Sequence, residues 1–388
     1  FDADKVRFRK GRPERIGGWN KYTDDSFIGT CRKLNVYRAA SGTNYINAGT
    51  HQKLYIVQGN AFYDITPIRA TTTNGITFAA TDGSTTITAT DSNHGAVVGD
   101  FVTISEAVSL GGNITANVLN KEYQITAVPT VNTYSFTATA TANSSDTGNG
   151  GSGVDGAYQI NTGLDVYVSS TGWGSGTWGA STWGSATTLS VTNQLRLWSL
   201  DNFGDDAISN VRNGGIFYWD ESAGNSTRAV NISTLGGASN VPTIALQVMV
   251  SDVDKHVIAF GCNPIGSSTL DPLFVRFSDT ESIADWTPTA TNQAGGVQLS
   301  MGSTIIGALR TRQEILIWTD AGIVSMRFVG APFVFSFNEV AHGPSLISPN
   351  AAVNANNQVY FMDRGGFYSY SGSAQRLPCT VLDYVLSD

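Results

Sequence analysis

Five aspartates of this sequence are candidates for the catalysis of hydrolysis: Asp205, Asp206, Asp220, Asp279 and Asp363. Hydrolysis of a glycosidic bond uses two carboxyl groups about 5 to 10 Å apart, one as the acid and one as the base or nucleophile. Each of these aspartates stands at a predicted turn, where Asp is favoured because its side chain bonds to nearby backbone N–H groups. We therefore interpret them as turn residues and predict no catalytic residue.

The four histidines, His51, His94, His256 and His342, show no pattern of a metal or cofactor site. None is spaced as in His-Glu-x-x-His or His-x-His, and no cysteine or carboxylate accompanies them at ligand spacing. The sequence also lacks a Gly-rich phosphate loop and a nucleophile elbow. We predict no metal, no cofactor and no enzymatic activity.

A basic segment lies near the start of the sequence, where Val6 to Trp19 reads VRFRKGRPERIGGW. Residues 1–21 carry seven Lys or Arg against three Asp or Glu, a local charge of +4, so the remaining residues sum to -12 within a total of -8. Guanidinium groups suit the carboxylates of an interface, so this segment is a candidate docking arm for an acidic neighbour. An edge strand with ion pairs inside the chain is an equally good interpretation. The candidate interface residues are Arg7, Arg9, Arg12, Arg15 and Trp19.

Three further tryptophans form a second candidate interface. Trp173, Trp178 and Trp183 lie five residues apart in GWGSGTWGASTWGS, a spacing that fits neither a strand face nor a helix stripe. Because Trp is enriched at protein interfaces, we expect an ordered hub or interface loop. A sugar-stacking platform is the alternative, although the run contains no acidic residue.

The elements that position these side chains are predicted to be strands. Charged residues make up 14% of the 388 residues, below the roughly 25% usual for soluble domains, and Gly, Thr and Ser are abundant. Short β-branched and aromatic runs recur between turn residues, and the spacing typical of an amphipathic helix is nearly absent. We predict an all-β chain.

An internal repeat indicates a β-propeller. Glu314–Phe328 and Gln358–Tyr370 each read as strand, Asp-x-Gly turn and strand, and the turn aspartates Asp320 and Asp363 are 43 residues apart. We expect the turn glycines, Gly322 and Gly365, to supply a positive φ. A repeat of about 40 to 50 residues is the size of one propeller blade. Fainter copies lie at Lys53–Ile65, at Gly214–Asp220, and at His256–Phe260 followed by Leu273–Asp279.

Composition divides the chain into three parts. Residues 1–69 would hold the N-terminal arm and the first propeller strands, and residues 154–388 the remainder of the propeller, with more sequence expected beyond Asp388. Residues 70–153 are Thr-rich and nearly free of Lys and Arg, which predicts an inserted small β-barrel or sandwich domain. Ala142–Gly153 would be its flexible return linker.

Several of these stretches resemble one family. VRFRKGRPERIGGW is similar to the opening of the tail nozzle proteins of short-tailed bacteriophages, also called tail tubular protein B or packaged-DNA stabilisation proteins. Trp173–Gly184, Ile317–Phe337 and Leu377–Asp388 are similar to later stretches of that family.

The resemblance implies a structural virion protein that forms a homo-hexameric ring in the phage tail and is assembled in the cytoplasm of the bacterial host. Its partners would be the adaptor or connector proteins above it and tail fibre or needle proteins around or below it. Double-stranded DNA would be held and then ejected through the channel without sequence-specific binding, and the chain would not insert into a membrane. An acidic body predicts an acidic or neutral channel wall, to which DNA does not adhere.

Two other functions fit some of the same features. The tryptophan run and the acidic turns would suit a tail-associated propeller glycosidase or depolymerase. The insert would suit a carbohydrate-binding adhesin that contacts the host surface.

Overall fold

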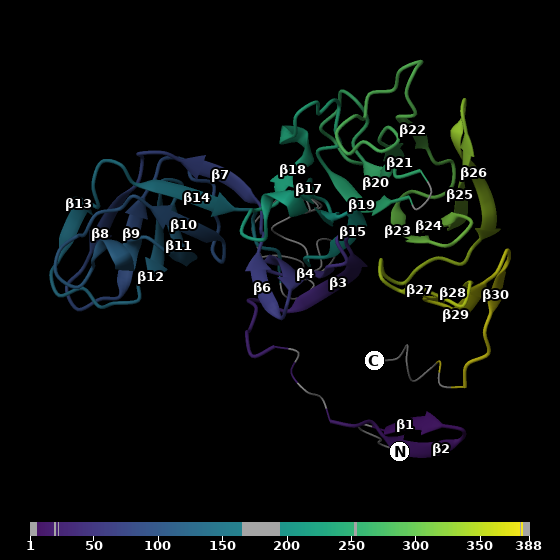
Figure 1. Cartoon of the computed structure of the whole chain (residues 1–388), viewed down its shortest axis with the longest axis horizontal. Coiled ribbons are helices and arrows are strands. Elements are labelled where there is room, and N and C mark those ends of the chain that lie inside the picture. The colour runs from purple at the N-terminus through teal and green to yellow at the C-terminus, as the bar shows by residue number, and fades with distance from the viewer. Residues whose placement is uncertain are drawn as a thin grey trace, which may run out of the picture.

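A computed structural model of the chain describes residues 6–18, 21, 23–164, 195–251, 254–380 and 382. The described part is nearly all β, as predicted from the sequence, and its one α-helix is the four-residue α1 (Ala116–Leu119). None of the helices in this part has the length and hydropathy of a membrane span. Three bodies are distinguishable in Figure 1: a propeller, an insert beside it, and a small hairpin at the N-terminus.

Five four-stranded antiparallel sheets form a five-bladed β-propeller arrangement, which confirms the predicted fold class (Figure 1). Within each blade the strands pair in chain order, because tight turns favour pairing of consecutive strands. The strands of blades 1 and 2 are β3 (Cys31–Arg38), β4 (Asn44–Thr50), β5 (Leu54–Gln58) and β6 (Ala61–Asp64), then β15 (Trp198–Phe203), β16 (Asp206–Val211), β17 (Ile216–Trp219) and β18 (Val230–Asn231). Those of blades 3 and 4 are β19 (Ala245–Val250), β20 (Val257–Cys262), β21 (Asp271–Phe277) and β22 (Gly295–Gln298), then β23 (Ile305–Arg310), β24 (Ile315–Thr319), β25 (Gly322–Gly330) and β26 (Val334–His342). Blade 5 contains β27 (Ala352–Ala355), β28 (Gln358–Asp363), β29 (Gly366–Tyr370) and β30 (Ala374–Arg376).

The core of the propeller lies between its blades. Four apolar clusters are each built from two neighbouring blades, so that blades 1 to 4 each bury one face against the following blade. Trp219 of blade 2 packs edge-on against Tyr45 of blade 1 at 5.7 Å between ring centroids, and Trp318 of blade 4 packs against Phe361 of blade 5 at 5.5 Å. The first strands of the blades contact one another in the order β3, β15, β19, β23 and β27, and therefore line the hub.

The predicted hairpins are present, with two differences from expectation. β24–β25 and β28–β29 are the second and third strands of their blades, whereas the copy at Lys53–Ile65 falls on the third and fourth strands, β5 and β6. The prediction of a positive φ at Gly322 and Gly365 is wrong. Gly322 is required for a different reason, since a Cβ there would lie 2.2 Å from the carbonyl oxygen of Ala341 on β26. In the other hairpin the positive φ, 138°, belongs to Gly366.

The insert is an eight-stranded sheet between blades 1 and 2, in the order β13-β8-β9-β12-β11-β10-β14-β7. Its strands are β7 (Ile68–Thr72), β8 (Thr77–Ala80), β9 (Thr86–Thr90), β10 (Phe101–Ser105), β11 (Glu122–Thr130), β12 (Thr133–Thr137), β13 (Asp146–Asn149) and β14 (Asp155–Gln159). The sheet is thus slightly longer than the predicted residues 70–153, and β13 occupies part of the segment expected to be a linker. Its core is made of its own side chains, Phe78, Tyr134 and Phe136 among them. Because β13 and β7 end the strand order, closure into a barrel or sandwich stays a prediction.

Deleting Thr71–Gly153 should leave a propeller that unfolds in one cooperative transition. The physical reason is that the insert buries its own apolar cluster and each blade buries its faces against other blades. Thermal unfolding followed by circular dichroism measures this. A deletion variant without any cooperative transition would show that the insert is part of the propeller core.

Candidate assembly surfaces

A basic hairpin, formed by β1 (Val6–Arg9) and β2 (Arg12–Arg15), contains the four arginines singled out in the sequence. It turns at Lys10 and Gly11, whose φ angles of 52° and 76° are those of a two-residue turn that matches strand twist. Residues that face each other across two strands share one side of the sheet. One face therefore holds Arg7, Arg9, Arg12 and Glu14, and the other holds Val6, Phe8, Pro13 and Arg15.

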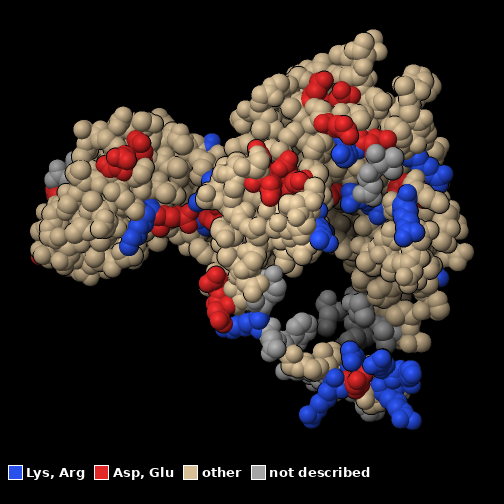
Figure 2. All heavy atoms as spheres, in the orientation of Figure 1, with Lys and Arg blue, Asp and Glu red and all other residues tan. Residues whose placement is uncertain are grey.

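Both faces of the basic hairpin are open to solvent. Phe8 is 73% exposed, and the hairpin lies apart from the propeller, with its Lys and Arg side chains gathered in Figure 2. Arg7 forms an ion pair with Glu14 at 3.3 Å, which is the intrachain pairing that the alternative interpretation requires. Within the described part of the chain, however, Arg9, Arg12 and Arg15 form no ion pair. One arginine of the four is thus neutralised locally, and three are available to a partner.

Trp19, Trp173, Trp178 and Trp183 lie outside the described residues.

An acidic patch lies on blade 2, at the turn between β15 and β16 and at the loop after β17. It consists of Asp205, Asp206, Asp220 and Glu221. The backbone N–H of Glu221 donates to Asp206 at 3.0 Å, and Asp205 accepts from the backbone N–H of Ala40 at 2.6 Å. These four carboxylates are half-buried, and none pairs with a Lys, Arg or His among the residues described. Figure 2 shows acidic side chains gathered over blade 2.

Tyrosines, rather than cations, stabilise the carboxylates of the acidic patch. Tyr45 donates its hydroxyl to Glu221 at 2.8 Å, and Tyr218 donates to Asp206 at 2.6 Å. Burial, together with Glu221, raises the pKa of Tyr45 to about 12, and burial with Asp206 raises the pKa of Tyr218. Both phenols therefore stay protonated at neutral pH and act as donors, so the negative charge of the patch is kept.

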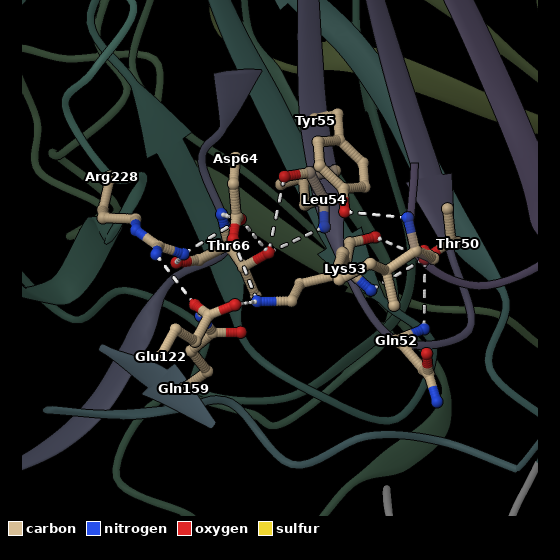
Figure 3. A network of polar contacts seen from close by, with 11 residues as sticks. Thr50, Gln52, Lys53, Leu54, Tyr55, Asp64, Thr66, Glu122, Gln159 and Arg228 are labelled. Atoms are coloured by element: carbon tan, nitrogen blue, oxygen red, sulfur yellow. Dashed lines mark hydrogen bonds and ion pairs between the residues drawn. The ribbon is translucent and has the colours of Figure 1, made fainter. Parts of the chain in front are cut away.

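A second polar cluster joins the insert to the propeller through a fully buried lysine, Lys53 (Figure 3). The Lys53 ammonium lies 2.9 Å from Asp64 and 2.6 Å from Glu122, and 4.1 Å from the ring centroid of Phe101. Arg228 of blade 2 completes a four-membered network, at 2.9 Å from Asp64 and 3.3 Å from Glu122. Glu122 and Phe101 belong to the insert, so this network positions the insert against blades 1 and 2.

The network keeps Asp64 ionised although it is largely buried. Burial alone would raise the pKa of this carboxyl group, but Lys53 and Arg228, with hydrogen bonds from Thr66, hold the pKa below its usual value. Sequence reasoning missed this cluster. Its one signal was a lysine directly before the apolar run LYIV, where a lysine needs a buried counter-charge.

The five aspartates considered for catalysis do not all lie in one site. Asp205, Asp206 and Asp220 meet in the acidic patch, whereas Asp279 accepts a backbone N–H from Gln293 in blade 3 and Asp363 ends β28 in blade 5. No group of three or more His, Cys, Asp or Glu side chains suited to a metal occurs in the described ranges.

A different pair of carboxylates shares one cavity. Asp254 and Glu314 line a space of about 70 Å³ beside blade 4. Burial raises the pKa of Asp254, and Glu314 pairs with Arg327 at 2.9 Å and accepts from Tyr370 at 3.2 Å. The two carboxyl groups thus lie in different surroundings, as the carboxyl pairs used in acid–base catalysis do. The space is small, since ligand pockets are typically about 300 to 1,000 Å³.

Comparison with known proteins finds no matching family model and no matching curated protein. Solved structures with similarity include the phage phi92 endosialidase, with 10% identity and a TM-score of 0.28 over 90% of this chain and 55% of that one. PorZ of the Porphyromonas gingivalis type-IX secretion system gives 10% identity and a TM-score of 0.31 over 95% of this chain and 43% of its own. The extracellular domain of the one-component system BT4673 from B. thetaiotaomicron gives 11% identity and a TM-score of 0.27 over 96% of this chain and 62% of its own. The chain thus spans less than two thirds of each of these proteins, and TM-scores this low support no inference about function.

The Lys53 network should make the protein sensitive to acid. Because the folded pKa of Asp64 is depressed, its stabilisation is fully present above the ordinary carboxyl pKa of about 3.9 and is lost as the pH falls through the lower folded value. Asp64→Asn should be less stable than the wild type at pH 7, by about 3 kcal/mol because Lys53 keeps only one carboxylate partner. The difference should shrink below pH 4. Urea unfolding at pH 3 to 7 measures it, and Asp82→Asn, at an exposed position, is the control. A difference that stays constant with pH would contradict the assignment.

Proposed function

We propose that this chain is a structural subunit of the tail nozzle ring of a short-tailed bacteriophage. The observation that carries the proposal is the basic hairpin, which stands off an acidic propeller and has neither face covered by another described part of its chain. A surface of this kind belongs to a subunit that binds neighbours, because an isolated two-stranded sheet is marginally stable in water. The resemblance of VRFRKGRPERIGGW to the nozzle family covers the same residues.

The small hub of the propeller favours a DNA channel between subunits over a channel through a single subunit. The cavity among its first strands measures about 120 Å³, room for only a few water molecules. Lys33 and Arg212 also line this cavity, where Lys33 donates to Asn350 and Arg212 donates to the backbone carbonyls of Ile305 and Ile306. This small volume favours passage of DNA through an opening formed by several copies, which a ring supplies.

Electron microscopy of the purified protein should show rings with a central hole, and the rings should have six-fold symmetry. Gel-shift titration should show duplex DNA binding no tighter than that of a generic acidic protein at about 0.15 M salt. The reason is the charge of -12 outside residues 1–21. A monodisperse monomer at high concentration would refute the ring, and submicromolar, salt-sensitive DNA binding would refute a passive conduit.

A glycosidase of the phage tail is the second candidate, favoured by the one cavity that holds Asp254 and Glu314. Its small volume argues against it, because a sugar ring needs space for both carboxyl groups to reach one bond. If the chain is an enzyme, release of reducing sugar from host surface polysaccharide should fall at least about 100-fold in Asp254→Asn and in Glu314→Gln. Asp82→Asn serves as the control. Because we propose a structural role, we expect no release of sugar from any of these proteins. If the wild type releases sugar and either variant abolishes this release, the result favours the enzyme.

A further inference from the structure

The two faces of the basic hairpin differ in chemistry, and this difference specifies what can cover them. Arg7, Arg9 and Arg12 project from one face with Glu14, and Phe8 projects from the other. Successive residues on one face of a strand are about 6.7 Å apart, and directly paired residues are about 5 Å apart. The basic face therefore presents guanidinium groups at a spacing that several separate carboxylates can meet. Arg7 already pairs with Glu14, so a single carboxylate from a partner would leave one of Arg9 and Arg12 unpaired.

The acidic patch of blade 2 gathers four carboxylates that have no cation partner among the described residues, unlike several other carboxylates of the protein. Asp64 and Glu122 pair with Lys53 and Arg228, Glu314 pairs with Arg327, and Asp201 pairs with Arg310. The carboxylates of the patch receive only tyrosine, serine and backbone donors in the part of the chain that the structure describes. They are also fixed in place by these donors, so a partner does not have to order them.

We propose that the basic face of the hairpin docks on the acidic patch of a second copy of this chain. The charges are complementary, and in Figure 2 the hairpin stands away from blade 2 of its own chain. The contact joins two different surfaces, so it is heterologous, and heterologous contacts generate rings when the rotation between copies closes. This inference rests on the proposed ring and names the contact that forms it.

Charge reversal on either side tests the contact. Arg9→Glu with Arg12→Glu on the hairpin, and Asp220→Lys with Glu221→Lys on the patch, should each weaken association at least about tenfold at 0.15 M salt. The variant that combines all four changes should associate to within about threefold of the wild type, because the attraction is restored with reversed sign. Sedimentation velocity over a concentration series measures the association, and thermal unfolding confirms that each variant is folded.

Two controls separate the contact from general effects of charge. Arg364→Glu and Asp82→Lys change exposed charges of the same kinds outside both surfaces and should leave association unchanged. Asp220→Asn with Glu221→Gln removes the patch charge while keeping the side-chain shape. It should weaken association by less than the reversal does. It also tests the patch if the lysine variant fails to fold.

The outcomes distinguish this inference from the proposed function. Normal rings in both reversal variants would overturn the contact and leave the ring standing. Loss of association on hairpin reversal without recovery in the combined variant would place the hairpin on another surface and also overturn it. A wild-type protein that stays monomeric at every concentration would overturn both.

Discussion

The burial of thin sheets against their neighbours is the constraint on which the rest of the propeller depends. A four-stranded blade has two faces and too few residues to cover either one, so every blade must use its neighbours. The apolar clusters accordingly lie between blades, where Trp219 meets Tyr45 and Trp318 meets Phe361. Aromatic rings fill these gaps because each buries a large area with few rotatable bonds. The same packing places the ends of the strands at the surface, where turns are free to carry charge.

Charge follows two different rules in this molecule. Inside, at the junction with the insert, each charge has an opposite partner within about 3 Å, as burial of Lys53 requires. On the surface, arginines gather on the hairpin and carboxylates gather on blade 2. Internal pairing fixes the position of the insert, whereas the segregated surface charges leave attraction available to another molecule.

The strands and the blade repeat were predictable from the sequence because they depend on local patterns. Alternation and turn residues such as Asp320 and Asp363 recur at blade spacing, and the hairpins follow from them. The clusters were not predictable. Lys53, Glu122 and Arg228 come from three separate regions of the chain, and the acidic patch combines two loops, so only the folded backbone brings them together. Gly322 shows the same limit, since its constraint is a close approach to Ala341 on the next strand.

The position of the insert between blades 1 and 2 bears on how the chain folds. Contacts between β3 and β15 join residues far apart in sequence, and closing such a loop costs conformational entropy. Within the insert, however, Ile68 on β7 pairs with Gln159 on β14, which makes its two ends neighbours. Once the insert has folded, the effective length of the connection is much shorter. Early folding of the insert thus offsets the sequence separation that the insert adds between blades 1 and 2, and the order of folding favours the insert before the blades.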